Sequence, residues 1–117
     1  MVFNYQVNYD FNWDDKKAST NFAKHKVSFE EGKTIFKDPF LITHPDKLHS
    51  DNEDRLITIG MSINERLLLV VHLEKLKTVN SVLIRIISCR KATPFERQKY
   101  SSLSFFFSAP ASAPRTV

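Results

Sequence analysis

The sequence predicts an α+β domain in which helices pack on one side of a small antiparallel sheet. Three observations predict it: a strictly alternating apolar pattern at the start of the chain, two capped helical segments after it, and β-branched runs separated by polar turns in the second half. The length of 117 residues fits a single domain with one core. We expect this domain to span residues 1–100 and residues 101–117 to form a disordered tail.

The first half of the domain combines one strand with two helices. Residues 3–12 alternate apolar with polar side chains, which is typical of a strand. Asp14 is a good N-cap for a first helix that extends to about His25. Ser28-Phe29-Glu30-Glu31 has the pattern of a capping box, in which Ser28 and Glu31 each satisfy a backbone N–H group near the other. It predicts a second helix that ends at Lys37-Asp38-Pro39.

The second half predicts four strands in an antiparallel meander and a final helix. Runs rich in Ile, Val and Leu, separated by polar turns, indicate strands at residues 40–43, 55–61, 67–74 and 82–89. Thr93-Pro94-Phe95-Glu96 then combines a capping Thr, a proline at the first helical position and a Glu three residues after the cap. We expect this helix to stop within one turn of Tyr100, because serines and Ala-Pro dipeptides dominate the residues that follow.

Composition excludes several classes of function. Apolar residues make up 42% of the chain and charged residues 26%, which is typical of neither a disordered tail nor a membrane protein. The two glycines rule out a P-loop and a dinucleotide-binding fingerprint. The single cysteine, Cys89, cannot form an internal disulfide and suits a reducing compartment. We therefore expect a cytoplasmic protein without a membrane partner.

Positive charge is concentrated in the second half of the sequence. Residues 1–54 carry seven lysines and ten acids, whereas residues 55–117 carry all six arginines, four lysines and three acids. Because guanidinium groups bind phosphate oxygens in a bidentate manner, this asymmetry indicates a nucleic-acid partner. A solvated basic face explains the same composition equally well. Direct binding of DNA is disfavoured, since no predicted helix is both basic and free of apolar packing.

Three blocks of the sequence carry a recognisable pattern. They are Phe11-x-Trp13-Asp14-x-x-Lys17-x-x-x-Asn21-x-x-Lys24-His25-x-Val27-Ser28-Phe29-Glu30-Glu31, the pair Arg55-Leu56-x-x-Ile59-Gly60 and Leu68-x-Val70-Val71-His72, and Arg85-Ile86-Ile87-Ser88-x-Arg90-Lys91-Ala92-Thr93-x-x-Glu96-Arg97-x-x-Tyr100. Together they span residues 11–100 and resemble the BrnT-type toxins. The resemblance implies a RelE-like fold, ribonuclease activity and membership of a toxin–antitoxin pair.

The same resemblance implies partners and marks two departures from the family. The implied partners are an RNA substrate and a BrnA-like antitoxin, through which alone the chain would contact DNA. Lys26 stands where the family usually has glycine, which costs ~1 kcal/mol if the left-handed backbone is kept. The turn at residues 75–81 is longer than in the family. The tail after Tyr100 matches nothing in the family either, and together with the long turn it suggests the alternative function, a catalytically inactive or decayed toxin that still binds its antitoxin.

Metal-free RNA cleavage through the 2′-OH needs a proton acceptor, stabilisation of charge on phosphorus and a proton for the leaving 5′-oxygen. Histidine ionises near neutral pH, and His25 lies in a short cationic corner between the first two helices, so His25 is our candidate for proton transfer. The resemblance implies Lys17 and Lys24 as alternatives, because RelE-like folds often use lysine or arginine in this role. On the last strand, alternation places Ser88 and Arg90 on one face and Arg85 and Cys89 on the other. We expect no cofactor and no metal. The candidate catalytic residues are His25, Arg55, Arg85, Ser88 and Arg90, and the candidate RNA-binding residues are Lys17, Lys24, Lys91 and Arg97.

Structural interpretations compete with several of these assignments. Arg90 can pair with an acid such as Glu96 instead of phosphate, and His25 can simply cap the first helix. His72 shares a face with Leu68 and Val70, which favours a core histidine. Cys89 is better explained as a small buried side chain than as a nucleophile. The polar segment His44–Asp51 matches no closed zinc site and indicates an ordinary loop.

Overall fold

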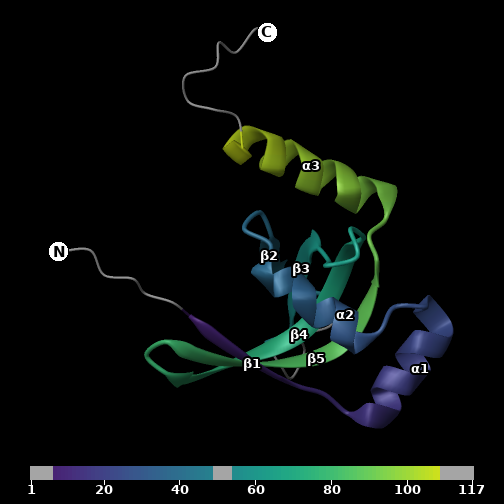
Figure 1. The fold of residues 1–117 in the computed structure, drawn as a ribbon, viewed down its shortest axis with the longest axis vertical. Helices are drawn as coiled ribbons and strands as arrows, with labels where there is room; N and C mark the ends of the chain where they lie inside the picture. Colours follow the sequence, from purple (N-terminus) through teal and green to yellow (C-terminus); the bar gives the residue numbers. More distant parts are fainter. Residues whose placement is uncertain (1–6, 49–53, 109–117) are drawn as a thin grey trace, which may run out of the picture.

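The computed structural model describes residues 7–48 and 54–108, which form a five-stranded sheet with helices on both sides (Figure 1). The strands follow the spatial order β1-β5-β4-β3-β2. Along the chain the elements are β1 (Asn8–Asn12), α1 (Asp15–His25), α2 (Phe29–Lys33), the 3₁₀ helix η1 (Thr34–Lys37), β2 (Ile42–Pro45), β3 (Leu56–Met61), β4 (Leu67–Thr78), β5 (Ser81–Lys91) and α3 (Pro94–Ser108).

The sheet is mixed, so the prediction of a purely antiparallel sheet is wrong. Strands β2 to β5 form the expected antiparallel meander, but β1 pairs with β5 in parallel, with Asn8 opposite Ser81 and Asn12 opposite Arg85. A parallel neighbour requires a long connection, and the whole chain between β1 and β5 supplies it. The alternating pattern identified β1 as a strand but did not specify its partner.

The hairpin of β4 and β5 is longer than the sequence predicted. The segment 75–81, expected as a long turn, is almost entirely paired, and Thr78 lies opposite Ser81 around a turn formed by Val79 and Asn80. Val79 and Leu76 are strongly exposed, so burial does not explain this arm. Backbone pairing and the β propensity of Thr78 and Val82 favour continued strands instead. The arm has one irregularity, a register shift at Lys77 between Leu76 and Thr78, and it projects from the sheet beside β1 (Figure 1).

Each face of the sheet carries its own core cluster. On one face α2 and η1 contribute Phe29, Ile35 and Phe36, which pack with Leu68, Val70, Ile84, Ile86 and Cys89. On the other face Tyr100 of α3 packs with Ile59, Leu67 and Leu69. The prediction that all helices lie on one side is therefore wrong. Both faces of β4 are apolar at Leu67–Val70, and each of them needs a cover.

Helix α3 continues to Ser108, so the prediction that it stops within one turn of Tyr100 is wrong. Serine is tolerated inside helices, and no proline interrupts the chain before Pro110. Tyr100 fixes the helix to the body, because its hydroxyl donates to the Asp38 carboxylate at 2.5 Å. The expected disordered tail at residues 101–117 is thus wrong for 101–108, and residues 109–117 lie outside the described part of the chain.

The predicted caps mostly hold. Asp14 accepts from the Lys17 backbone N–H at 3.0 Å, and Thr93 and Glu96 form both halves of a capping box. Ser28 accepts from the Glu31 backbone N–H at 3.0 Å, but the Glu31 side chain turns instead to Ser62 and Arg66. This second half of the box was predicted wrongly, because a nearly buried carboxylate forms stronger bonds with a guanidinium group than with a backbone N–H.

Candidate functional site

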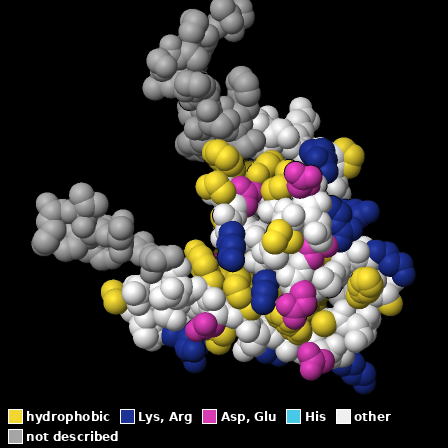
Figure 2. Space-filling view, in the orientation of Figure 1, with side chains coloured by type: hydrophobic (Ala, Val, Ile, Leu, Met, Phe, Trp, Pro, Cys, Tyr) yellow, Lys and Arg dark blue, Asp and Glu magenta, His cyan; other side chains and the backbone are white. Residues whose placement is uncertain are grey.

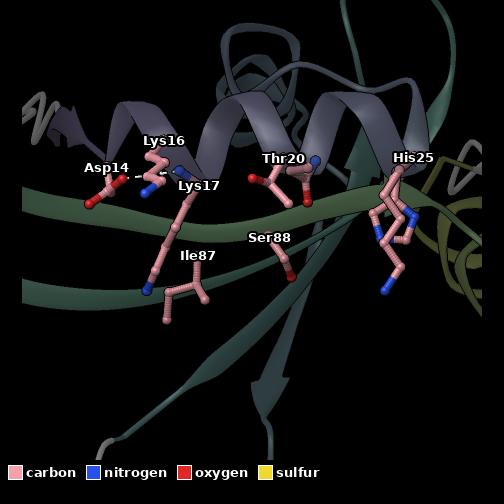
Figure 3. Close-up of a pocket in the computed structure, with 9 residues that line it drawn as sticks. Asp14, Lys16, Lys17, Thr20, His25, Ile87 and Ser88 are labelled. Carbon is pink, nitrogen blue, oxygen red and sulfur yellow. Dashed lines mark hydrogen bonds between the residues drawn. The ribbon is translucent and has the colours of Figure 1, made fainter.

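A groove of about 500 Å³ lies between α1 and β5, and four of the predicted site residues line it. Lys17, Lys24 and His25 come from α1, and Ser88 comes from β5. In Figure 3 the Lys17 side chain reaches toward β5 at one end of the groove, His25 lies at the other end and Ser88 lies between them. Three candidate phosphate ligands, Lys17, Lys24 and Ser88, and the His25 imidazole therefore line the same groove.

The buried side chain of Asn21 fixes α1 against β5. Pairing of β1 with β5 ends at Arg85, and no strand in the described part of the chain pairs with the edge of β5 that follows. Asn21 takes that place: its carbonyl oxygen accepts from the Cys89 backbone N–H at 3.1 Å, and its amide donates to the Cys89 carbonyl at 2.8 Å and the Val27 carbonyl at 3.1 Å. The Asn21 side chain thus makes the hydrogen bonds that a neighbouring strand would make, and it holds α1 in place as one wall of the groove.

The residues that face the groove from α1 follow helical spacing. Lys17, Thr20, Asn21 and Lys24 stand at positions i, i+3, i+4 and i+7, which places them on one side of the helix. This polar stripe was visible in the sequence, yet only its two lysines were singled out. The spacing could have identified Thr20 and Asn21 as well.

Arg85 extends the positive charge beyond the Lys17 end of the groove. Its guanidinium contacts the Asn12 side chain at 3.4 Å. The pKa of Asp14 is lowered, mainly because its carboxylate accepts from the Lys17 backbone N–H, and the nearby positive charges of Lys17 and Arg85 add to this effect. Figure 2 shows Lys and Arg side chains along the right-hand side of the molecule, over α1 and the start of α3.

A β-bulge corrects the predicted faces of β5. Val71 pairs with Ser88 but His72 pairs with Ile86, so Ile87 is an extra residue in the strand. The insertion places Arg85, Ser88 and Arg90 on the same face, opposite Leu73, Val71 and Leu69 respectively. Cys89 instead joins the core cluster on the other face. Strict alternation had separated Arg85 from Ser88, and the bulge brings them together.

Arg90 forms an ion pair with Glu96, which is the alternative to phosphate binding that the sequence suggested. Its two terminal nitrogens donate to the two carboxylate oxygens of Glu96 at 2.8 and 2.9 Å. Each partner stabilises the charged form of the other, so the pKa of Glu96 is lowered and that of Arg90 is raised. The remaining candidates Lys91 and Arg97 are exposed near the start of α3. Arg90 is therefore positioned by the cap of α3.

Arg55 lies apart from the groove. It directly precedes β3, whose first residue, Leu56, pairs with His72 on β4. Two strand spacings, about 10 Å, separate β3 from β5. The structure thus groups His25, Lys17, Lys24 and Ser88, places Arg85 and Arg90 beside them, and leaves Arg55 at a distance.

His72 and Cys89 are core residues, as predicted. The His72 ring is fully buried, its Nε2 atom lies 2.7 Å from the Thr58 hydroxyl, and burial lowers its pKa to about 4. Burial also raises the pKa of the Cys89 thiol to about 12, so the thiolate is not available near neutral pH. His44 and Asp46, by contrast, are not in a plain loop: β2 includes His44, and Asp46 is buried directly after that strand.

Within residues 7–48 and 54–108, no three His, Cys, Asp or Glu side chains are grouped closely enough to hold a metal ion. None of the helices in that part of the chain has the length and apolarity needed to cross a membrane.

Comparison with known proteins gives a family match over most of the domain. The sequence profile described as "Ribonuclease toxin, BrnT, of type II toxin-antitoxin system" matches residues 13–96. The chain belongs to the BrnT toxin family. The matched segment begins just before α1 and ends in the first turn of α3, so it includes both walls of the groove. As a BrnT-family member, the chain is a type II toxin of a ribonuclease family with an antitoxin as the implied partner.

A solved structure supports the same fold. The crystal structure of the Brucella abortus ribonuclease toxin BrnT matches with a TM-score of 0.51 and 22% sequence identity, over 74% of this chain and 99% of that chain. Comparison with curated protein sequences gives no match. The solved structure therefore supports the α+β architecture of this BrnT chain, and the profile supports its family.

Proposed function

We propose that this BrnT-family chain is an endoribonuclease that cleaves RNA through the 2′-OH in the groove between α1 and β5. The observation that carries the proposal is the arrangement of Lys17, Lys24, His25 and Ser88 along that groove. Lysines and a hydroxyl group are suitable ligands for a phosphodiester, and an imidazole at the end of the same groove can transfer protons. The family description supports the same activity.

The chemistry assigns one task to each side chain. His25 takes the proton from the 2′-OH, whose oxygen then bonds to the adjacent phosphorus. The P–O bond to the next nucleotide breaks with its electron pair going to the 5′-oxygen, which takes a proton from the His25 imidazolium or from water. The products are a 2′,3′-cyclic phosphate and a 5′-hydroxyl. Lys17, Lys24 and the Ser88 hydroxyl stabilise the charge that develops on the phosphoryl oxygens. No step in this sequence requires a metal ion.

Arg85 and Arg90 flank this centre on the face of β5 that carries Ser88. Arg85 extends the phosphate path at the Lys17 end, and Arg90 is available to phosphate when it exchanges its Glu96 partner for RNA. Lys91 and Arg97 would bind backbone phosphates farther along the chain. Arg55 is the weakest of the predicted catalytic residues, because it lies two strands away.

The family also supports a biological setting. We infer that the fold is RelE-like, that a BrnA-like antitoxin neutralises this toxin in the cytoplasm, and that the toxin reaches DNA only through that antitoxin. A search for a small reading frame beside the gene of this chain, followed by co-expression of its product with the chain and co-purification, tests this partner. Growth arrest in a host that lacks the antitoxin tests toxicity.

Cleavage of a single-stranded RNA by the purified chain in EDTA tests the reaction. We expect products with 2′,3′-cyclic phosphate and 5′-hydroxyl ends, and no cleavage at a position that carries a 2′-deoxyribose. His25→Ala should reduce the rate by about 100- to 10,000-fold, the usual contribution of a general acid or base. Lys37→Ala is the matched control, because Lys37 is an exposed lysine on η1, outside the groove.

The outcomes separate the two functions that the sequence left open. A folded wild-type chain that binds its antitoxin and cleaves no RNA, with or without Mg²⁺, would instead support the inactive binding module. Cleavage that survives in His25→Ala at the wild-type rate would remove His25 from the mechanism while leaving the enzyme intact.

A further inference from the structure

A second hollow lies next to the groove, on the sheet face that carries Ser88 and Arg90. It has a volume of about 430 Å³, which is within the range typical of small-molecule sites. Its floor is apolar and consists of Ile57 and Ile59 from β3 and Leu69 and Val71 from β4. The first turns of α3 form one wall. Apart from Arg90, no residue that lines this hollow has a part in the reaction described above.

The wall formed by α3 presents an aromatic ring to solvent. Phe95 is 76% exposed although it lines the hollow, and it is absent from both core clusters. An apolar floor beside an exposed ring is the surface on which an unpaired nucleobase stacks, because both faces of a base are apolar and its edges are polar. Glu96, Lys99 and His44 place acceptors and donors around the rim.

Charge distinguishes this hollow from the groove. The groove gathers Lys16, Lys17 and Lys24. The hollow balances its charges: Arg90 is bonded twice to Glu96 in the free protein, and the other charged side chains among its described lining residues are Lys99 and Asp46, of opposite sign. The groove is therefore suited to phosphate, and the hollow is suited to a neutral ring. Val71 of the floor pairs directly with Ser88 of the groove, so these two lining residues stand on neighbouring strands, about 4.8 Å apart.

We propose that this hollow binds a nucleobase of the RNA whose backbone lies in the groove. The inference rests on the proposed ribonuclease function and adds to it the part of the substrate that is recognised beside the cleaved bond. An unpaired base is required, since a base within a helix is stacked on its neighbours and cannot enter. The preferred substrate is therefore single-stranded RNA.

The test uses the full chain and small probes. Methyl NMR spectra are recorded with each of the four nucleoside 5′-monophosphates and with ribose 5-phosphate, which has no base. We expect at least one nucleotide to shift the methyl signals of Ile57, Ile59, Leu69 and Val71, and ribose 5-phosphate to leave them unchanged. Phe95→Ala should weaken that binding by about five- to hundredfold, and Phe95→Tyr should retain it. Phe22→Ala, on another exposed phenylalanine, should have no effect.

The results distinguish this proposal from the one on which it rests. Nucleotide binding in the hollow by a chain that cleaves no RNA would support the nucleobase site and refute the proposed cleavage reaction. Cleavage of RNA at the same rate and affinity by Phe95→Ala, with floor methyl signals that no nucleotide shifts, would overturn the base site and keep the reaction. Floor signals that respond only to the antitoxin would also overturn it, because the hollow would then be a protein interface.

Discussion

Gly32 on α2 and Cys89 on β5 make a close contact that should be detectable as an energetic coupling. A Cβ atom added at Gly32 would lie 2.8 Å from the Cys89 Sγ atom, whereas ordinary contact begins near 3.4 Å. The sulfur cannot move away easily, because Cys89 is fully buried and Asn21 bonds both its backbone N–H and its carbonyl. We therefore expect Gly32→Ala to strain the packing of α2 on the sheet.

Two opposing contributions set the size of the effect. Replacing glycine with alanine in a helix favours folding by about 1 kcal/mol, and overpacking a core costs about 1–3 kcal/mol. The free energy of unfolding should thus fall by up to about 2 kcal/mol. In a Cys89→Ala background the next contacts are at 3.5 Å, which is ordinary packing, so the same substitution should become neutral or stabilising.

Urea denaturation of the wild type, the two single variants and the double variant measures this coupling. We expect a coupling free energy of about 1–3 kcal/mol, with the thermal midpoint of Gly32→Ala lowered by about 4–8 °C for each kcal/mol lost. Additive effects of the two substitutions, within about 0.5 kcal/mol, would show that the contact is not tight and would refute the reasoning.

Three further predictions concern stability. Lys26→Gly should raise the free energy of unfolding by about 1 kcal/mol, because Lys26 has a φ of 59°, in the left-handed region that favours glycine. Lys26→Ala should give no such gain when both variants are measured by urea denaturation. Glu31 is 7% exposed, and its bonds to Arg66 lower its pKa from 4.5 to about 2. Ionised Glu31 should therefore contribute about 3 kcal/mol to the free energy of unfolding above pH 5, and this contribution should be lost as the pH falls toward 2. A Glu31→Gln variant whose stability depends on pH as steeply as that of the wild type would contradict this. Asn21→Asp should cost about 2–4 kcal/mol, since a carboxylate oxygen would face two backbone carbonyls, and an unchanged midpoint would contradict the role of this side chain.

Local signals predicted most of the elements. The caps at Asp14 and Thr93 gave the starts of α1 and α3 correctly, because each cap depends on residues within one helical turn. The strand predicted at 55–61 differs from β3 by one residue, whereas β2 begins two residues later than predicted. The end of α3 was missed because proline, the strongest stop signal, stands only at position 110.

Long-range signals were not available from the sequence. The parallel partner of β1 and the use of both sheet faces depend on which surfaces meet in space, and period-two patterns do not contain that information. The sequence pattern also gives no sign of the bulge at Ile87, since a single extra residue in a β-branched run leaves the pattern unchanged. The candidate site was therefore predicted by residue type, while the grouping of Lys17, His25 and Ser88, and the role of Asn21, required the fold.

The parallel pairing of β1 with β5 has a consequence for synthesis of the protein. Asn12 and Arg85 contact each other although they are 73 residues apart in the chain. Translation proceeds from the N-terminus, so β1 and α1 leave the ribosome long before the strand on which both depend. The wall of the groove formed by β5 does not exist in a partly synthesised chain. A nascent toxin therefore cannot assemble its groove on the ribosome that is making it until translation of the domain is almost complete.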